Sequence, residues 1–254
     1  MSEFAHIVVR REGNVEHLVL NRPHVRNAFN DELIVEVSAW AQRASADRDL
    51  RAVVISGAGP SFCAGADLAW MTRMAGYSRE ENLRDARAAA AMFDAINTLP
   101  VPVIARVHGA ALGGGAGLAA VADVAVADES ATFGFTEVKL GLVPSIISPY
   151  VLAKIGQSAA RELFVTGRRF SAEHAREIGL VHVVVAADQL DRTVRKFLDE
   201  ILANGREAMA TAKALLRDIA SRSITDATPL TTETIAARRA SGEAQERMRE
   251  FLKK

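Results

Sequence analysis

Alternating apolar and polar residues open the chain. In HIVVRREGNVEHLVLN, residues 6–21, two β-rich runs flank Glu12-Gly13-Asn14, and this pattern predicts a β-hairpin. Apolar residues then recur at helical spacing after Asn30, which is predicted to be the N-cap of a helix. The recurring residues are Leu33, Ile34, Val37, Trp40 and Ala44.

Short apolar runs farther along the chain predict buried strands. These runs are RAVVISG (51–57), PVIARVHG (102–109), DVAVAD (123–128) and LVHVVV (180–185). Between them, Ser78 and Glu81 match a capping box that predicts a helix over 79–97, and Ser171 is predicted to cap a helix that stops at Gly179. Strands therefore alternate with helices, which is typical of an α/β fold.

The pattern is helical throughout from Asp188 onward, with Gly205 and Pro229 as predicted breaks. We expect a core over residues 1–187 and a C-terminal helical region over 188–254, with no linker between them. The helical region is predicted to pack on the core or on a neighbouring subunit. Apolar positions on its first helix favour a role in assembly. They include Leu190, Val194, Leu198 and Ile201.

Composition narrows the class of protein. The 254 residues are 49% hydrophobic and 24% charged, which is ordinary for a globular protein. Lys plus Arg and Asp plus Glu are both 31, so the net charge is zero, which argues against a nucleic-acid partner. Cys63 is the single cysteine, and neither a signal peptide nor a membrane-length apolar run is evident. A cytoplasmic protein without a membrane partner is expected.

A glycine-rich run lies in the middle of the chain. HGAALGGGAGLAAVAD, residues 108–123, has five glycines between positions 109 and 117 and no charge before Asp123. A P-loop would need a lysine that is absent here, and the dinucleotide-binding fingerprint has another glycine spacing and lies in the first βα unit. Two explanations remain open from the residues: an oxyanion hole made of backbone N–H groups, or tight packing of a helix against a strand.

A second segment of small residues, SFCAGADL (61–68), also follows a predicted strand. Two strand ends could each supply one N–H group to a single oxygen. With FGFTEVKLGLVP (133–144) downstream, the order of the segments resembles the crotonase superfamily, the enoyl-CoA hydratase/isomerase family. The resemblance extends from NRPHVRNAFNDEL to TGRRFSAEHAREIGLVHVVV.

This resemblance implies a fold, an assembly and a substrate. The fold would be a spiral of ββα repeats with a C-terminal helical region, and the chain would form a homotrimer or homohexamer. The substrate would be an acyl-CoA thioester whose carbonyl lies between the backbone amides of Ala66 and Gly114. CoA would be part of the substrate, with no separate cofactor and no metal. The implied substrate- and CoA-binding residues are Arg26, Asn27, Ala28, Ala64, Gly65, Ala66, Asp67, Leu68, Gly113 and Gly114.

The chain departs from the family pattern at one of two glutamates. The first glutamate position of the hydratases is Gly117 here, whereas the second is present as Glu137. Glu137 is therefore the expected acid–base residue, with a pKa raised by burial. PSIISPY (144–150) replaces a glycine-rich turn found in many members. Together with Gly117, it resembles the branch that hydrates branched, carboxylated enoyl-CoAs of the 3-methylglutaconyl type.

The function predicted from these residues is that of an enoyl-CoA hydratase, a hydro-lyase. One alternative is a Δ3–Δ2 enoyl-CoA isomerase, for which a single glutamate would suffice, and another is a catalytically silent CoA-ester-binding protein.

Structural roles are predicted for the other residues whose side chains could be reactive. Cys63 is expected to be a packed thiol, His108 to satisfy a local hydrogen bond, and Asp67 to cap the helix that follows it rather than act in catalysis. The six histidines show no metal-ligand spacing.

Overall fold

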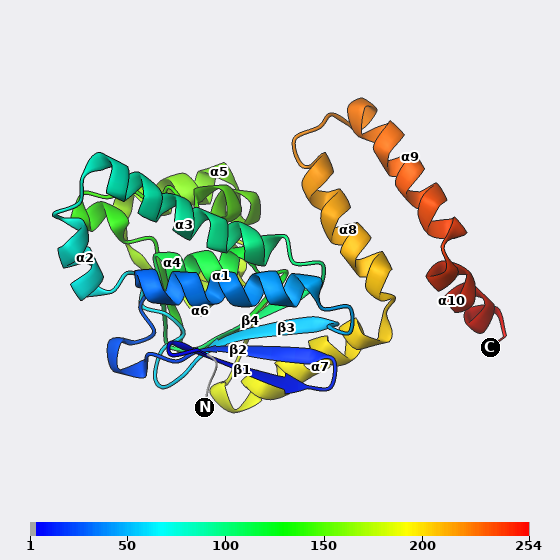
Figure 1. The fold of residues 1–254 in the computed structure, drawn as a ribbon, viewed down its shortest axis with the longest axis horizontal. Helices are drawn as coiled ribbons and strands as arrows, with labels where there is room; N and C mark the ends of the chain where they lie inside the picture. Colours follow the sequence, from blue (N-terminus) through cyan, green and yellow to red (C-terminus); the bar gives the residue numbers. More distant parts are fainter. Residues whose placement is uncertain (1–3, 254) are drawn as a thin grey trace.

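A six-stranded sheet forms the centre of the protein in the computed structural model, which describes residues 4–253 (Figure 1). Its strand order is β1-β2-β3-β4-β6-β9, with β1 antiparallel to β2 and the other neighbours parallel. The strands are β1 (Ile7–Glu12), β2 (Val15–Leu20), β3 (Ala52–Gly57), β4 (Val103–Val107), β6 (Val124–Asp128) and β9 (Val183–Val185).

A smaller sheet lies beside the first and has the order β5-β7-β8. β5 is parallel to β7, and β7 is antiparallel to β8. The strands are β5 (Ala110–Leu112), β7 (Thr132–Gly134) and β8 (Arg169–Ser171). This sheet was not predicted from the sequence, because strands of three residues are too short to show a period.

Helices cover both faces of the main sheet. α1, α3 and α4 lie on one face and α7 lies on the other (Figure 1). The α-helices are α1 (Asp31–Ala46), α2 (Leu68–Met74), α3 (Arg79–Asn97), α4 (Gly114–Val121), α5 (Ser148–Thr166), α6 (Ala172–Glu177), α7 (Leu190–Ala203), α8 (Arg206–Ile219), α9 (Ile224–Ala240) and α10 (Gly242–Leu252). Short 3-10 helices are η1 (Pro23–Val25), η2 (Glu137–Leu140) and η3 (Ala187–Gln189).

Local capping signals placed several elements correctly. Asn30 accepts a hydrogen bond from the Leu33 amide at 2.9 Å, and α3 begins after the predicted capping box of Ser78 and Glu81. The hairpin turns at Gly13, whose φ is +57°. The predicted strand over 180–185 is shorter than expected, because only Val183–Val185 pairs as β9.

Two sequence predictions for the helical parts were incomplete or wrong. Helix α5 was not predicted at all. Pro229 was predicted as a break, yet α9 continues through it. A proline cannot donate the helical hydrogen bond to the carbonyl four residues earlier, which here belongs to Thr225. Thr225 is exposed, so water can bond to its carbonyl instead. The break predicted at Gly205 is confirmed, since α7 ends and α8 begins there.

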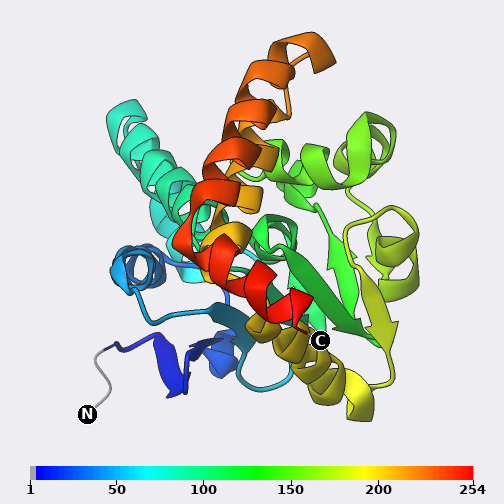
Figure 2. The same cartoon turned by 90° about the vertical axis from the view of Figure 1, so that its right-hand side faces the viewer.

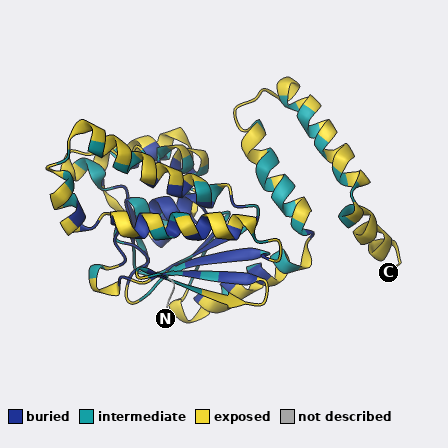
Figure 3. Cartoon of the chain, in the orientation of Figure 1, coloured by how far each residue is buried: buried dark blue, intermediate teal, exposed yellow. Residues whose placement is uncertain are grey.

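The apolar stripe on α7 is buried within the chain itself. Leu190, Val194 and Leu198 pack on the sheet with Val54 and Ile104, among others. The expectation that this stripe serves assembly is therefore wrong. By contrast, α8, α9 and α10 contain no fully buried residue and stand to one side of the body (Figures 1, 2 and 3).

Cationic side chains attach α8 to the body. Lys213 donates to Asp123 Oδ2 at 2.7 Å and to the Val101 carbonyl at 3.2 Å. Arg206 donates to the Leu50 carbonyl at 3.0 Å, close to the C-terminal end of α1. Cations at such carbonyl-rich ends are favourable, so the helical region has a defined docking site on its own core.

Candidate active site

A cavity of about 160 Å³ lies where α1, α2, α3 and α4 meet the segment after η2. Its lining side chains are mostly apolar, and none of them is lysine, arginine or histidine. The lining residues are Phe29, Ile34, Ala66, Trp70, Ala89, Met92, Phe93, Gly114, Glu137, Val143, Pro144, Ser145, Ile146 and Ile147. The three residues predicted to be catalytic, Ala66, Gly114 and Glu137, are therefore brought together at one cavity.

Backbone hydrogen bonds on either side of Ala66 fix the direction of its amide. The Phe29 amide donates to the Gly65 carbonyl at 2.7 Å, and the Asp67 amide donates to the Phe29 carbonyl at 2.8 Å. Neighbouring residues of an extended chain direct their amides to opposite sides, so the Ala66 N–H points away from Phe29. Ala66 is exposed between two buried neighbours, and its amide has no hydrogen-bond partner within residues 4–253.

The Gly114 amide reaches the same cavity from the start of α4. Gly113 precedes the helix with φ +50° and ψ −120°, a conformation that favours glycine. Amides in the first turn of a helix lack intrahelical partners, and the N-terminus carries partial positive charge. Like that of Ala66, the Gly114 amide is unpaired within the part of the chain that the structure describes. Ala66 and Gly114 therefore both line the cavity and both have an unpaired backbone amide.

The glycine run also serves close packing. A Cβ atom at Gly115 would lie 2.2 Å from the Cys63 carbonyl oxygen, and one at Gly114 would lie 2.9 Å from the Phe29 ring. These contacts let α4 approach the segment that contains Ala66. Tight packing, one of the two explanations left open by the sequence, is thus confirmed, whereas the oxyanion hole stays a prediction. The packing does place the two unpaired amides among residues that line one cavity.

Glu137 begins η2 and is partly buried beside α4. Its Oε1 would lie 3.1 Å from a Cβ atom at Gly113, so the carboxylate is next to the N-terminus of that helix. Its Oε2 is buried and has no hydrogen-bond partner among the residues described. Burial raises the pKa of Glu137 above its ordinary value of 4.5, in the direction expected from the sequence. A raised pKa makes the carboxylate a stronger base, which suits a role in proton transfer.

Comparison with known proteins identifies the family of this arrangement. Residues 10–254 match the family model described as Enoyl-CoA hydratase/isomerase. The chain belongs to the enoyl-CoA hydratase/isomerase family. Among curated relatives, it is 31% identical to a crotonyl-CoA hydratase from Syntrophomonas wolfei, over 99% of this chain and 96% of the relative. It is 32% identical to a short-chain-enoyl-CoA hydratase from Clostridium acetobutylicum, over 83% and 80% of the two chains.

Solved structures support the same family and fold. The crystal structure of an enoyl-CoA hydratase from Shewanella pealeana superimposes with a TM-score of 0.96 and 36% identity, over 99% of this chain and 94% of the other. A crotonase-family structure from Legionella pneumophila gives a TM-score of 0.92 and 39% identity, over 98% and 96%. The predicted α/β crotonase fold is confirmed. The chain is accordingly an enzyme of the hydro-lyase class, with a general hydratase/isomerase function.

Within this enoyl-CoA hydratase/isomerase chain, the residues expected to contact CoA differ in accessibility. Arg26 and Leu68 are exposed and Ala64 is half-buried, so their side chains are open to a ligand. Asn27, Ala28, Gly65, Asp67 and Gly113 are buried. The Asn27 side chain is fully engaged, since it accepts from the Arg22 amide and donates to the carbonyls of Ala58 and Ser61. A role for it in direct CoA contact through the side chain stays a prediction.

The residues given structural roles from the sequence have them. Burial raises the pKa of Cys63 to about 12, so this thiol is protonated at neutral pH. His108 Nε2 is 2.9 Å from the Gly59 carbonyl oxygen. Asp67 caps α2 by accepting from the amides of Ala69 and Trp70. Within residues 4–253, no three His, Cys, Asp or Glu side chains are grouped so that they could hold a metal ion.

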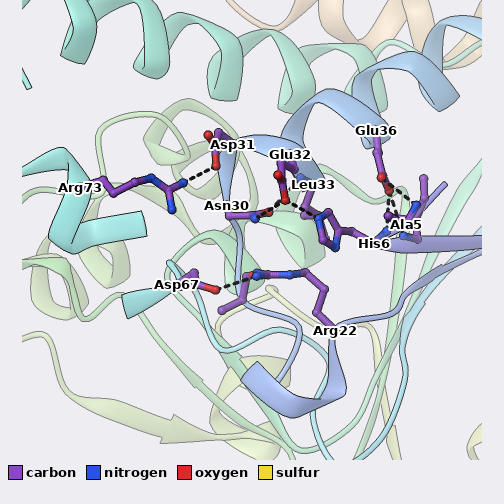
Figure 4. Close-up of polar contacts among 12 residues, drawn as sticks. Ala5, His6, Arg22, Asn30, Asp31, Glu32, Leu33, Glu36, Asp67 and Arg73 are labelled. Atoms are coloured by element: carbon purple, nitrogen blue, oxygen red, sulfur yellow. Dashed lines mark hydrogen bonds and ion pairs between the residues drawn. The ribbon is translucent and has the colours of Figure 1, made fainter. Parts of the chain in front are cut away.

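Several residues that shape the site were not predicted from the sequence. Ile147 fills the space beside Gly117, and Trp70 and Phe93 form walls of the cavity. Arg22 forms a buried ion pair with Asp67, directly next to Ala66 (Figure 4). Arg22 lies in the NRP tripeptide at the start of the matching region, but no local pattern shows a partner 45 residues away.

No helix within the described range is long and apolar enough to cross a membrane.

Proposed function

We propose that this chain catalyses the reversible addition of water to the α,β double bond of a short enoyl-CoA thioester. One arrangement carries the proposal: the unpaired carboxylate of Glu137 and the free amides of Ala66 and Gly114 meet at a single apolar cavity. The names of the relatives are consistent with an acyl-CoA thioester substrate.

The two amides would hold the thioester carbonyl oxygen. When water adds to the β-carbon, the electrons of the double bond move toward that oxygen and form an enolate. Fixed donors stabilise the developing negative charge, and the loss of one such donor typically lowers kcat by about 10²–10³-fold. The apolar lining strengthens this electrostatic effect, because it excludes bulk water.

Glu137 would serve both proton transfers. Its carboxylate takes a proton from water while the water oxygen bonds to the β-carbon, and the resulting carboxylic acid then gives a proton to the α-carbon. In the reverse direction the same group removes the α-proton and returns one to the leaving hydroxide. A pKa raised by burial suits a group that must act as base and then as acid.

The absence of a second carboxylate favours a second candidate function. Gly117 stands at the position of the other family glutamate, so Glu137 is the single carboxylate among the lining residues. One carboxylate is sufficient to move a proton between the α- and γ-carbons, which is the reaction of a Δ3–Δ2 enoyl-CoA isomerase. A silent CoA-ester binder is less well supported, because a protein that only binds the ester needs no buried, unpaired carboxylate beside the proposed site of the thioester carbonyl.

We infer that the preferred acyl group is short and branched. The cavity is small and lined by branched and aromatic side chains such as Ile146, Ile147 and Phe93. The sequence favoured a branched and carboxylated substrate of the 3-methylglutaconyl type. A carboxylate in this cavity would have no cation among the lining residues, and burying an unpaired charge is costly. The geometry therefore supports the branched feature more than the carboxylated one.

A panel of acyl-CoAs tests these alternatives in one assay. Crotonyl-CoA, 3-methylcrotonyl-CoA, 3-methylglutaconyl-CoA and a 3-enoyl-CoA are each incubated with the enzyme, and products are identified by mass. A hydratase lowers the absorbance of the conjugated thioester and adds one water. An isomerase converts the 3-enoyl-CoA with a gain of absorbance and no change of mass. Tight binding without any turnover would identify a silent binder and contradict both enzymatic functions.

We further propose that the chain forms a homotrimer or homohexamer. Support comes from exposed apolar residues on α8, α9 and α10. These helices stand to one side of the body and contain no buried residue (Figure 3). Leu216 on α8 is 67% exposed, Ile224 on α9 is 89% exposed, and Phe251 on α10 is 78% exposed. Exposed apolar surface of this kind is characteristic of protein interfaces.

A further inference from the structure

A buried ion pair is formed by Asp67, the residue that follows Ala66, and Arg22. Arg22 and Asp67 are only 8% and 6% exposed, and Arg22 Nη2 is 2.8 Å from Asp67 Oδ2 (Figure 4). Arg22 Nη1 also donates to the Ala28 carbonyl at 2.5 Å. One guanidinium group therefore bonds to the residue before Phe29 and to the residue after Ala66. These are the two chain segments whose backbones pair at Phe29 and Ala66.

The two carboxylate oxygens of Asp67 have separate tasks. Oδ1 accepts from the amides of Ala69 and Trp70 at 2.8 and 3.3 Å and so caps α2. Oδ2 accepts from Arg22. The pKa of Asp67 is lowered: burial acts to raise it, but the hydrogen bonds from Arg22 and from the two amides outweigh burial. The helix cap and the ion pair can thus be altered independently by substitution.

Arg22 is itself held by the loop that carries it. Its amide donates to Asn27 Oδ1 at 2.9 Å, and Asn27 Nδ2 donates to the carbonyls of Ala58 and Ser61. Arg26 and Asn27 both have positive φ, 54° and 56°, which is an uncommon backbone conformation. The hydrogen bonds of the buried Asn27 side chain hold the loop in this conformation. The backbone of Arg22 is therefore anchored through Asn27 to the segment that follows β3, while its guanidinium bonds to Ala28 and Asp67.

We propose that Arg22 is a positioning residue that fixes the direction of the Ala66 amide through Asp67. The idea rests on the proposed function, in which that amide is one of the two donors to the thioester carbonyl. Alanine has no polar side chain with which to fix its own amide, so the direction must come from its neighbours. Phe29 holds the residues on either side of Ala66 through the backbone, and Arg22 holds both of these segments together. Donors fixed in advance need no rearrangement during the reaction.

A second ion pair on the same helix provides a matched control. Arg73 Nη2 lies 2.6 Å from Asp31 Oδ1 and connects the end of α2 to the start of α1 (Figure 4). Both side chains are about half exposed, at 50% and 49%, and neither residue is among those that line the cavity. Removal of this pair should affect α2 without changing the direction of the amide.

The experiment compares Arg22→Met, Arg22→Lys, Asp67→Asn and Arg73→Met in the full-length protein. Asp67→Asn keeps an oxygen for the α2 cap but removes the carboxylate that Arg22 contacts. Displacements on the order of 1 Å can cost about 10²-fold in rate, so Arg22→Met and Asp67→Asn should lower kcat by about 10- to 100-fold. Arg22→Lys should recover part of this loss, because lysine reaches Asp67 but cannot also bond to Ala28 in a fork. Arg73→Met should retain the wild-type kcat.

A spectroscopic measurement separates amide direction from general damage. Butyryl-CoA with a carbon-13 carbonyl cannot be hydrated, and its infrared carbonyl stretch shifts to lower frequency when fixed donors contact the oxygen. We expect a smaller shift of the carbonyl stretch in Arg22→Met and Asp67→Asn than in the wild type. The dissociation constant of butyryl-CoA should change by less than about threefold, because the substitutions weaken one hydrogen bond among many contacts to the ligand. Arg73→Met should show the full wild-type shift.

The outcomes distinguish this proposal from the one on which it rests. A wild-type protein that binds butyryl-CoA without a shift would contradict the proposed function itself. A wild-type shift that persists undiminished in Arg22→Met and Asp67→Asn, with normal kcat, would overturn only the role of Arg22. If Arg22→Met does not fold, Asp67→Asn and Arg22→Lys still decide the matter, because each keeps a polar group in the buried position. Equal losses in Arg73→Met would likewise overturn the proposal.

Discussion

A Cβ atom at Gly117 would lie 2.4 Å from Cγ2 of Ile147, a separation that non-bonded carbon atoms do not adopt. The same atom would lie 3.2 Å from Cε1 of Phe93. Ile147 is 3% exposed and belongs to the hydrophobic core, so it cannot move aside freely. The space that a glutamate side chain would need at position 117 is thus occupied by an apolar group. The cavity therefore has the carboxylate of Glu137 in its lining and no room for a second one at position 117.

Gly117→Glu is therefore expected to impair the protein rather than to restore a two-glutamate site. Overpacking of a core typically costs about 1–3 kcal/mol, and a buried carboxylate without a partner adds to that cost. We expect a lower free energy of unfolding in urea and no gain in hydratase turnover. Gly117→Glu combined with Ile147→Gly should recover part of the lost stability. A Gly117→Glu single variant as stable as the wild type, with higher kcat, would contradict this account.

The features that the sequence predicted well are those with local causes. Asn30, Ser78 and Ser171 cap helices within three residues of themselves, and the hairpin turns on Gly13. The meeting of Ala66, Gly114 and Glu137 was predicted through resemblance to a family, because no local pattern relates segments so far apart.

The features that were missed depend on contacts across the fold. Arg22 meets Asp67 only because the loop after β2 lies against the loop after β3. Ile147 meets Gly117 only because the segment before α5 crosses α4. The error at Pro229 has another origin: proline usually ends a helix, but in the exposed second turn of α9 the lost hydrogen bond involves a carbonyl open to water.

The proposed assembly predicts a trimer or a hexamer in solution. Sedimentation velocity at micromolar concentration should show one of these species for the wild type. Leu216→Asp places a charge on the apolar side of α8 and should shift the distribution toward monomer, because an interface core excludes unpaired charge. Val35→Asp, on the exposed side of α1 at 64% exposure, serves as the control. A wild-type monomer would contradict the prediction.

The pKa of Glu137 predicts the acidic limb of the rate profile. Burial raises this pKa above 4.5, and the carboxylate form must be present to accept a proton from water. We expect kcat/KM to fall as the pH is lowered through a pKa that lies above the ordinary value of a glutamate. A profile that stays flat down to pH 4.5 would show that Glu137 is not the base in the free enzyme.

The same shift predicts how Glu137 affects stability. Below pH 4.5 the group is protonated in both the folded and the unfolded chain, so its contribution does not depend on ionisation. As the pH rises, Glu137 ionises first in the unfolded chain and only at higher pH in the folded protein. The free energy of unfolding therefore falls with rising pH until the folded-state pKa of Glu137 has been passed. Glu137→Gln should consequently raise Tm at pH 7, and the difference from the wild type should shrink below pH 4.5. Thermal unfolding at several pH values measures this difference, and a Gln variant less stable at pH 7 would contradict it.

Replacement of Glu137 by glutamine separates catalysis from binding most directly. Glutamine keeps the size of the side chain but cannot take a proton from water, so the hydration rate should fall by about 10²–10⁴-fold, or further if the one group serves both transfers. The dissociation constant of butyryl-CoA should change little, because the proposed contacts to the thioester come from the Ala66 and Gly114 amides. Cys63→Ser is the matched control, since this buried thiol is protonated and lies outside the cavity lining. A Glu137→Gln enzyme with undiminished turnover would exclude the single-carboxylate mechanism. Loss of turnover together with loss of butyryl-CoA binding would show instead that Glu137 holds the substrate.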